Sequence, residues 1–437
     1  MQMNDMVLIS VDDHIIEPPD MFETQLKGDV LASAPQHKET PDGTNYWEYQ
    51  GMIIPYVGIG AVTGRPPEEY GMEPTNLAQH RRGHWDVHAR IADMDVNGIA
   101  ASLNYPQMAG FDGGLFQKAK DKDAALIHLR AYNDWHLDVW CGAYPGRMIP
   151  NALLPTWNME ETVAEIKRQA AKGVTSVSLN DNPTKAGLPS IHNEYWNPMF
   201  KALADHDMVI NLHIGAGNPA PHASDETPIE AWITTMPMSV NVGMADWLYL
   251  KALRDYPTLK ICVSEGGLGW VPYLMERADY ANWRHKAWTH IDFGNDKPSD
   301  IFKRHFMICF VDDIFGLKHL EDLNEDMVAY ECDYPHSDCL WPEVPEYLWR
   351  SVKHLTDVQI DKITHGNVMR HYNFDLFSHF KREEITVGAL REKARLAGVD
   401  TTPVSYGGVK PTENPRVVTS GDIARMVMSQ QKAEEPA

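Results

Sequence analysis

The chain has 437 residues, of which 61 are acidic and 39 basic, and its formal net charge is -22. This balance argues against nucleic acid or an anionic membrane surface as the partner, because both repel a negative protein. The length fits one large barrel with insertions, or two domains. No apolar stretch approaches the roughly 18 to 20 residues of a membrane span, and Met1 to Asp5 contain no basic leader.

The five cysteines are odd in number and lack CxxC spacing, and four of them lie in or beside apolar runs. They are Cys141, Cys262, Cys309, Cys332 and Cys339. Buried free thiols in a reducing compartment explain this pattern better than disulfides. We therefore expect a cytoplasmic protein without a nucleic-acid or membrane partner.

The first predicted strand is an apolar run that ends in Asp12, Asp13 and His14. Side chains alternate along a strand, so Asp12 and His14 should share one face, while Ile9, Val11 and Asp13 share the other. We expect the face of Ile9 and Val11 to pack on a helical layer and leave Asp12 and His14 in the mouth of a barrel. A carboxylate and an imidazole two residues apart can share one cation. The alternative is a solvated strand end.

A stretch from about residue 18 to about residue 88 follows, rich in Pro, Gly, Tyr and Trp and with little periodicity. It is too long for an ordinary loop and predicts an insertion, or lid, over the mouth. Apolar runs and helical patterns then alternate, as in repeated βα units. The remaining predicted strands are Ile99–Asn104, Met148–Leu154, Val174–Leu179, Met208–His213, Leu259–Ser264, Phe306–Phe310 and Val328–Cys332.

Helical patterns separate several of these runs. They cover Ala89–Asn97, Ala124–Cys141, Met159–Lys172 with Gly173 as a C-cap, Asn197–His206 and Trp247–Asp255. Eight strands in this rhythm predict an α/β fold, a TIM-like (β/α)8 barrel over residues 1–376, with a long insertion after strand 1 and a C-terminal extension over residues 377–437. The extension either wraps a neighbouring subunit or is partly disordered.

Two more candidate ligands stand at predicted strand ends. The fifth strand ends in His213 and the eighth is followed by Asp333, in the sequence Glu331-Cys332-Asp333-Tyr-Pro-His336. In a barrel the fifth strand lies across from the first and the eighth lies beside it, so both side chains can converge on Asp12 and His14. Asp333 can bind a metal on one side and act as the base for metal-bound water on the other.

The ordered motifs resemble the amidohydrolase-related family, in the branch of aminocarboxymuconate-semialdehyde decarboxylase and the resorcylate-type decarboxylases. The matching motifs are Asp12-x-His14, Arg90-x-x-x-Met94-Asp95-x-x-Gly98-Ile99, His213, Gly269-Trp270-x-Pro272 with Glu276-Arg277, Asp333-Tyr334-Pro335 and Ile363-x-x-x-Asn367. They cover about residues 6 to 376. The resemblance implies a barrel that holds one divalent metal ion, commonly zinc or manganese, with Asp12, His14, His213 and Asp333 as ligands. Strand four ends in Leu179-Asn180 and offers no bridging lysine or glutamate, which also favours one metal.

One position departs from the decarboxylases of this branch, which typically carry a catalytic histidine at the end of strand six. Here Glu265 stands at or beside that position. A glutamate can act as a general base, or as a general acid if its pKa is raised, but it cannot donate and accept like a neutral imidazole. The glutamate at this position therefore favours hydrolysis over decarboxylation. A structural pairing of Glu265 with Arg277 is the alternative.

Further candidates surround these residues. His336 could donate a proton to a leaving group or hold a substrate carboxylate, and Asp338 could orient His336. Glu331 should share the inward face with Asp333, and Glu17 should anchor its loop. Asn211 and Trp270 complete the group of residues predicted to contact the substrate or support the ligands.

The amino-acid composition indicates which chemical class of substrate the protein accepts. Thirteen Trp and 21 Met residues, several in Tyr46–Met52, Trp232–Met238 and Trp283–Trp288, favour an apolar pocket for an aromatic or ring-derived small molecule. Arg65, Arg81 and Arg82 in the insertion either bind a substrate carboxylate or are solvated.

Three functions follow from these patterns. The leading hypothesis is a mononuclear metal-dependent hydrolase that attacks an amide, ester or C–C bond. The alternative is a non-oxidative decarboxylase of an aromatic or muconate-like acid. A third hypothesis is a binding protein that kept the barrel and lost turnover. In each case we expect a homo-oligomer.

Overall fold

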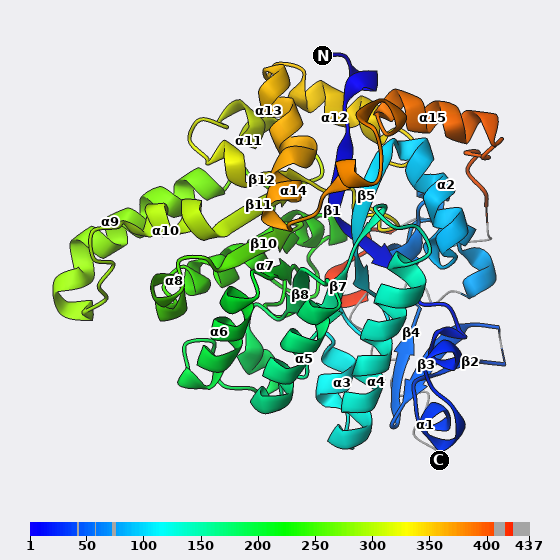
Figure 1. Cartoon of the computed structure of the whole chain (residues 1–437), viewed down its shortest axis with the longest axis horizontal. Helices are drawn as coiled ribbons and strands as arrows, with labels where there is room; N and C mark the ends of the chain where they lie inside the picture. Colours follow the sequence, from blue (N-terminus) through cyan, green and yellow to red (C-terminus); the bar gives the residue numbers. More distant parts are fainter. Residues whose placement is uncertain (42, 57, 72–75, 406–415, 423–437) are drawn as a thin grey trace.

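In the part of the chain that the structure describes, nine short strands form the centre of the molecule and the helices surround them (Figure 1). The computed structural model describes residues 1–41, 43–56, 58–71, 76–405 and 416–422. The central strands are β1 (Leu8–Ile15), β5 (Ile99–Pro106), β6 (Met148–Ile149), β7 (Asn151–Leu153), β8 (Ser176–Leu179), β9 (Val209–His213), β10 (Lys260–Ser264), β11 (Phe306–Phe310) and β12 (Val328–Tyr330). All of their pairings are parallel, as expected for repeated βα units.

The helices connect these strands along the chain. They are α2 (Val87–Asn97), α3 (Gly114–Lys118), α4 (Lys122–Trp135), α5 (Met159–Ala171), α6 (Asn197–Asp205), α7 (Ile229–Trp247), α8 (Lys251–Asp255), α9 (Val271–Thr289), α10 (Pro298–His305), α11 (Ile314–Lys318), α12 (Val344–Val352), α13 (Asp357–Asp361), α14 (Asn367–His371) and α15 (Val387–Leu396). No helix among the described residues is long and apolar enough to cross a membrane.

The insertion after β1 has regular structure of its own. It contains α1 (Gly28–Ala32) and an antiparallel sheet of β2 (Gln36–Glu39), β3 (Asn45–Tyr49) and β4 (Met52–Pro55), which lies beside α4. Sequence periodicity missed this sheet because its strands have only four or five residues. Residues 42, 57 and 72–75 of the predicted insertion lie outside the described part.

The backbone ladder around the barrel has two interruptions. The third predicted strand is split into β6 and β7 at Pro150, which has no N–H to donate. The ladder therefore runs as β1-β5-β6 and as β12-β11-β10-β9-β8-β7. Between β12 and β1 the connection is made just past the end of β12, where Asp333 N donates to Asp12 O at 2.7 Å and His14 N donates to Tyr334 O at 2.6 Å. These bonds join the two candidate ligand segments directly.

The prediction for the two faces of β1 is wrong in one respect. Ile9 and Val11 do not pack on the helical layer but belong to the apolar cluster inside the barrel. The register explains how Asp12 and His14 can also face inward, because Ile9 pairs with Ala101 whereas His14 pairs with Tyr105. His14 lies five residues after Ile9, but Tyr105 lies only four residues after Ala101, so β1 contains one extra residue. This β-bulge, between Ser10 and Asp13, reverses which side chains of β1 point into the barrel.

Two apolar clusters make up the core. The inner cluster fills the barrel below the candidate ligands and includes Ile9, Leu103, Val209, Cys262 and Met307. The outer cluster packs the other face of the strands against the helices. All five cysteines are buried and free, as predicted.

Several predicted boundaries need correction. The pattern over Trp247–Asp255 joins the end of α7 to α8, which begins at Lys251, and β12 ends at Tyr330 rather than at Cys332. The first part of the predicted C-terminal extension packs on its own barrel, because Val387 N donates to Met6 O at 2.8 Å and α15 contacts α2. Residues 406–415 and 423–437 of this extension lie outside the described part.

Candidate active site

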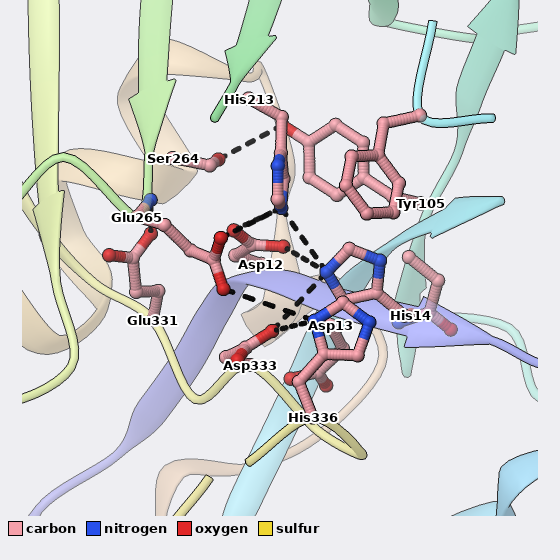
Figure 2. A network of polar contacts seen from close by, with 12 residues as sticks. Asp12, Asp13, His14, Tyr105, His213, Ser264, Glu265, Glu331, Asp333 and His336 are labelled. Carbon is pink, nitrogen blue, oxygen red and sulfur yellow. Dashed lines mark hydrogen bonds and ion pairs between the residues drawn. The ribbon is translucent and has the colours of Figure 1, made fainter. Parts of the chain in front are cut away.

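Three of the predicted ligands meet at the C-terminal ends of β1 and β9. His213 Nε2 lies 3.1 Å from Asp12 Oδ2 and 3.2 Å from His14 Nε2, and His14 Nε2 lies 3.3 Å from Asp12 Oδ1. All three side chains are at most 1% exposed. Figure 2 shows them converging from opposite sides of the barrel mouth, which is where barrel enzymes carry their active sites.

The ring of His213 is fixed by its backbone. His213 Nδ1 lies 2.6 Å from the carbonyl oxygen of Ile214, so Nδ1–H donates there and Nε2 presents its lone pair to the cluster. Metal-binding histidines are oriented in this way, with the second ring nitrogen bonded to a carbonyl or a carboxylate.

Glu265 and Asp333 enter the cluster from loops immediately after β10 and β12. Both have positive backbone φ angles, 55° and 57°, in the left-handed region that non-glycine residues seldom adopt. The Glu265 N–H donates to Glu331 Oε2 at 3.1 Å, and the Asp333 N–H donates to β1. These bonds hold two strained turns in place, as is common where side chains are positioned for a function.

His336 lies on the cavity side of the cluster. Its Nδ1 is 2.9 Å from Asp333 Oδ1 and 3.9 Å from Glu265 Oε1, and its Nε2 is 3.1 Å from Gln107 Oε1. The ring stacks on that of His14, with centroids 3.7 Å apart. The polar partners of His336 therefore do not include Asp338, so the predicted orienting role of Asp338 is not observed.

The donor atoms fall into two overlapping groups. Asp12, His14, His213 and Glu265 form one, and His14, Glu265, Asp333 and His336 form the other, each with ligand atoms within 4.8 Å of one another. Of the four predicted ligands, Asp12, His14 and His213 share the first group, and Asp333 belongs to the second, where its Oδ1 lies 3.2 Å from His14 Nε2. His14 and Glu265 belong to both groups. Glu265 does not pair with Arg277, whose guanidinium lies over the ring of Tyr280.

The carboxylates of this cluster fit a divalent cation. Both oxygens of Asp12 and both of Asp333 are buried and have no hydrogen-bond partner among the described residues. The nitrogens that surround them at 2.9–3.3 Å belong to imidazole rings. Buried oxygens and ring nitrogens that converge without hydrogen bonds form the donor set that binds zinc or manganese. The cluster can therefore hold one divalent metal ion.

The pKa values reflect the crowding of acids. Burial, together with Glu265 and Asp12, raises the pKa of Asp333 well above its usual range, and burial raises that of Asp12. Burial opposes charge on His213, but Asp12 and Glu265 outweigh it and raise the pKa of His213. The metal-free site therefore holds protons that a cation has to displace.

Other predicted residues support the site from a distance. Glu17, 1% exposed, accepts from the backbone N–H groups of Gln107 and Met108 at 3.0 and 2.8 Å. The sequence predicted an anchor for its own loop, whereas these bonds anchor the loop after β5. Asn211 lies deeper in the barrel and accepts from Tyr372 Oη at 2.7 Å. Trp270 donates to Gly266 O at 2.6 Å and is not among the residues that line the cavity.

A cavity of about 420 Å³ opens above the cluster. Glu265, Glu331, Asp333, His336 and Asp338 line its polar side. The apolar side is formed by Phe111, Ile214, Ile233, Met236, Pro237 and Phe310. No Lys or Arg is present among the described residues that line it.

The predicted apolar stretches contribute unequally to this cavity. Trp232–Met238 supplies residues to its wall, whereas Tyr46–Met52 belongs to the insertion sheet and Trp283 and Trp288 of α9 are each 69% exposed. The predicted basic residues bind elsewhere: Arg65 donates to Gln79 O, Arg81 pairs with Asp93 and Arg82 pairs with Asp86.

Some cavity residues had no signal in the sequence. Phe111 and Gln107 follow β5, and Gly60 in the insertion borders the cavity because the N–H groups of Val62 and Thr63 donate to Pro335 O. Only the rule that loops after barrel strands build the mouth could have indicated Phe111 and Gln107.

Parallel strands with an imidazole–carboxylate cluster at their carboxyl ends define a metal-dependent barrel enzyme. A family model described as amidohydrolase matches residues 44–374. The chain belongs to this amidohydrolase family, and the resemblance seen in its motifs is confirmed.

Solved structures of the same fold include an amidohydrolase from Mycobacterium avium subsp. paratuberculosis K-10 (TM-score 0.63, 19% identity, covering 84% of this chain and 99% of that one). A second is 5-carboxyvanillate decarboxylase from Novosphingobium aromaticivorans DSM 12444, complexed with manganese and 4-hydroxy-3-methoxy-5-nitrobenzoic acid (0.58, 18%, 85% and 99%). A third is 2,6-dihydroxybenzoate decarboxylase from Rhizobium (0.53, 14%, 84% and 99%). At these identities the similarity shows the fold alone.

Proposed function

We propose that this protein is a metal-dependent, non-oxidative decarboxylase of an aromatic or ring-derived carboxylic acid. The observation that carries the proposal is the cavity, which has an apolar wall suited to a ring and ends on the donor cluster. Because no Lys or Arg lines it among the described residues, a substrate carboxylate would find its counter-charge at the metal. Structures of the same fold that act on substituted benzoic acids support this choice over hydrolysis.

A metal ion bound by Asp12, His14 and His213 would supply positive charge that orients the substrate carboxylate and stabilises the charge that develops on the substrate ring. The remaining chemistry is a proton transfer. The C–C bond to the carboxylate breaks, its electron pair stays on the ring carbon, carbon dioxide leaves, and the carbon takes one proton. Asp333 borders the cavity and is the group we assign to deliver that proton.

His336 and the apolar wall hold the reactants in place. His336 Nδ1, 2.9 Å from Asp333 Oδ1, fixes the orientation of the Asp333 carboxylate. Phe111, Ile233 and Met236 keep bulk water from the ring. Exclusion of water strengthens each electrostatic interaction in the site and protects the carbanion-like ring from premature protonation by solvent.

The assignment is tested with metal-loaded protein and a panel of hydroxylated benzoic acids, by measuring carbon dioxide and the decarboxylated ring. Asp333→Asn should lower turnover by about 10²- to 10⁴-fold, the range typical of general acid–base groups, with its melting temperature retained. Asp338→Asn is the matched control, since Asp338 lines the same cavity but is exposed. Full activity of Asp333→Asn would refute the assigned proton donor.

Hydrolysis is the second candidate, because Glu265 stands where the resembling decarboxylases carry a histidine. Glu265 borders the cavity with a carboxylate that could take a proton from an attacking water. Incorporation of ¹⁸O from labelled water into the product of an ester or amide, without release of carbon dioxide, would favour hydrolysis over decarboxylation.

A further inference from the structure

The outer end of α9 stands free of the barrel. Figure 1 shows α9 extending away from the central strands, and every residue from 283 to 290 is exposed. The buried residues of α9 all lie in its first half and are Val271, Leu274, Met275 and Ala278. Because most helical stability in proteins comes from tertiary packing, a regular helix end with no packing of its own indicates a partner outside the chain.

Aromatic side chains line the exposed face of this helix. Tyr273 is 71% exposed, Trp283 and Trp288 are each 69% exposed, and Tyr280 is 49% exposed. Positions three, four and seven residues apart share one face of a helix, so Tyr273, Tyr280 and Trp283 form a stripe on the side opposite the buried residues. Single exposed apolar residues are common, but a continuous row of them marks an interaction surface.

The stripe is large enough for a stable association. Phe315 of α11 extends it, because this side chain is 62% exposed and lies against Gly269, just before α9. An aromatic side chain offers about 150–250 Å², so the five aromatic residues, each about two-thirds exposed, offer about 500–800 Å² together. A standard interface buries about 800 Å² on each partner, so the stripe supplies most of the area that a dimer needs.

The residues beside the stripe are complementary to a second copy of the same helix. When two copies of α9 pack antiparallel about a two-fold axis at Tyr280, residues equally far before and after Tyr280 face each other. Glu276 and Arg284 are each four residues from Tyr280, so opposite charges meet twice. Arg277 and Trp283 are each three residues away, which places a guanidinium by an indole ring. Neither Glu276 nor Arg284 forms an ion pair among the described residues of its own chain.

The local charge allows this contact in an acidic protein. The whole chain carries a net charge of -22, which repels a second copy. The helix α9 instead has three basic residues, Arg277, Arg284 and Lys286, against the acidic Glu276 and Asp279. Two copies can therefore meet at α9 without the repulsion that the rest of the chain produces.

We propose that the exposed face of α9 is a self-association surface, and that its occupant is α9 of a second copy of this chain, packed antiparallel about a two-fold axis at Tyr280. Trp288 then lies near Tyr273 of the second copy, and Glu276 and Arg284 form two equivalent ion pairs. Two-fold contacts of this kind are the commonest in homo-oligomers. No residue of α9 is among the described residues that line the substrate cavity, so this surface acts independently of the reaction there.

Sedimentation equilibrium of the full-length protein tests this contact. The wild type should have an even multiple of the mass of one chain. Trp283→Glu, which places a charge in the contact, should have half the wild-type mass, with circular dichroism verifying that it is folded. Leu396→Glu is the matched control, because Leu396 of α15 is also 71% exposed on a helix, and the mass of this variant should equal that of the wild type.

Two results would overturn the association itself. One is an unchanged mass of folded Trp283→Glu. The other is a monomeric wild type, and its binding to phosphatidylcholine vesicles would assign the stripe to a lipid surface instead.

Exchange of charges tests the antiparallel register. Glu276→Arg brings two cations together across the axis and Arg284→Glu brings two anions together, so each should raise the dissociation constant about tenfold or more. The double variant Glu276→Arg/Arg284→Glu restores opposite charges and should return the dissociation constant to within about threefold of the wild-type value. A double variant that associates as weakly as the single variants contradicts the register and overturns the proposal.

Discussion

Asp13 gives a direct test of how β1 is built. It faces away from the ligand cluster and accepts from Ser10 Oγ and Tyr334 N, both at 3.1 Å, at the point where β1 meets the segment carrying Asp333. Burial raises the pKa of Asp13 from 3.8 to about 6, although Arg90 and these hydrogen bonds act in the opposite direction. Asp13→Asn keeps the shape and the acceptor oxygen and removes the titration.

The direction in which stability changes with pH depends on whether the folded or the unfolded chain holds the proton of Asp13. Between the unfolded pKa of 3.8 and the folded value of about 6, the folded chain retains a proton on Asp13 that the unfolded chain has released. The folded protein therefore becomes less stable as the pH rises through this range. A shift of about 2 units corresponds to about 3 kcal/mol in full, and to about 2 kcal/mol between about pH 4.5 and about pH 7.5.

The assay is equilibrium urea unfolding of the wild type and Asp13→Asn at pH steps across that window, with saturating metal in both. The free energy of unfolding of Asp13→Asn should rise relative to the wild type by about 2 kcal/mol from the acidic to the neutral end. A difference that stays constant with pH would refute the reasoning, since it would mean that Asp13 titrates alike in the folded and unfolded chains.

Three further predictions concern the same framework. Arg90 is fully buried and donates to Gly83 O at 2.7 Å and to His14 O at 2.5 Å, so Arg90→Met should lower the free energy of unfolding by about 3–5 kcal/mol. Arg82 is exposed, so Arg82→Met should change the free energy of unfolding by under about 1 kcal/mol. Equal effects of the two substitutions would contradict this prediction. Glu17→Ala strands two backbone N–H groups and should cost about 2–4 kcal/mol by urea unfolding, and a loss below about 1 kcal/mol would show that water replaces the carboxylate. Because burial raises the pKa of Asp12, Mn²⁺ binding to the group of Asp12 should release a proton and strengthen as the pH rises, which calorimetry in buffers of different ionisation enthalpy measures; no buffer dependence would argue that Asp12 is already ionised.

Strand composition and strand-end residues predicted much of the fold and most of the candidate cluster. Runs such as Phe306–Phe310 and Met208–His213 coincide with β11 and β9 to within one residue, because strands buried on both faces consist of apolar residues throughout. His213 could be placed opposite β1 because strand order fixes its position around a barrel.

The errors concern features that pattern alone does not encode. Alternation predicted Ile9 and Val11 on the outer face, but the β-bulge after Ser10 depends on pairing with β5 and has no mark in the sequence of β1. The grouping of Glu265 with His213 depends on a backbone turn at positive φ, which hydrophobic periodicity does not report.

The most direct test of decarboxylation uses hydroxybenzoic acids labelled with ¹³C in the carboxyl group, incubated with metal-loaded and chelated protein in deuterated water. We expect release of one ¹³CO₂ per ring, one deuterium on the ring carbon that carried the carboxylate, and loss of both signals on chelation. Retention of the ¹³C label across the panel, with metal-dependent cleavage of ester or amide analogues instead, would contradict it.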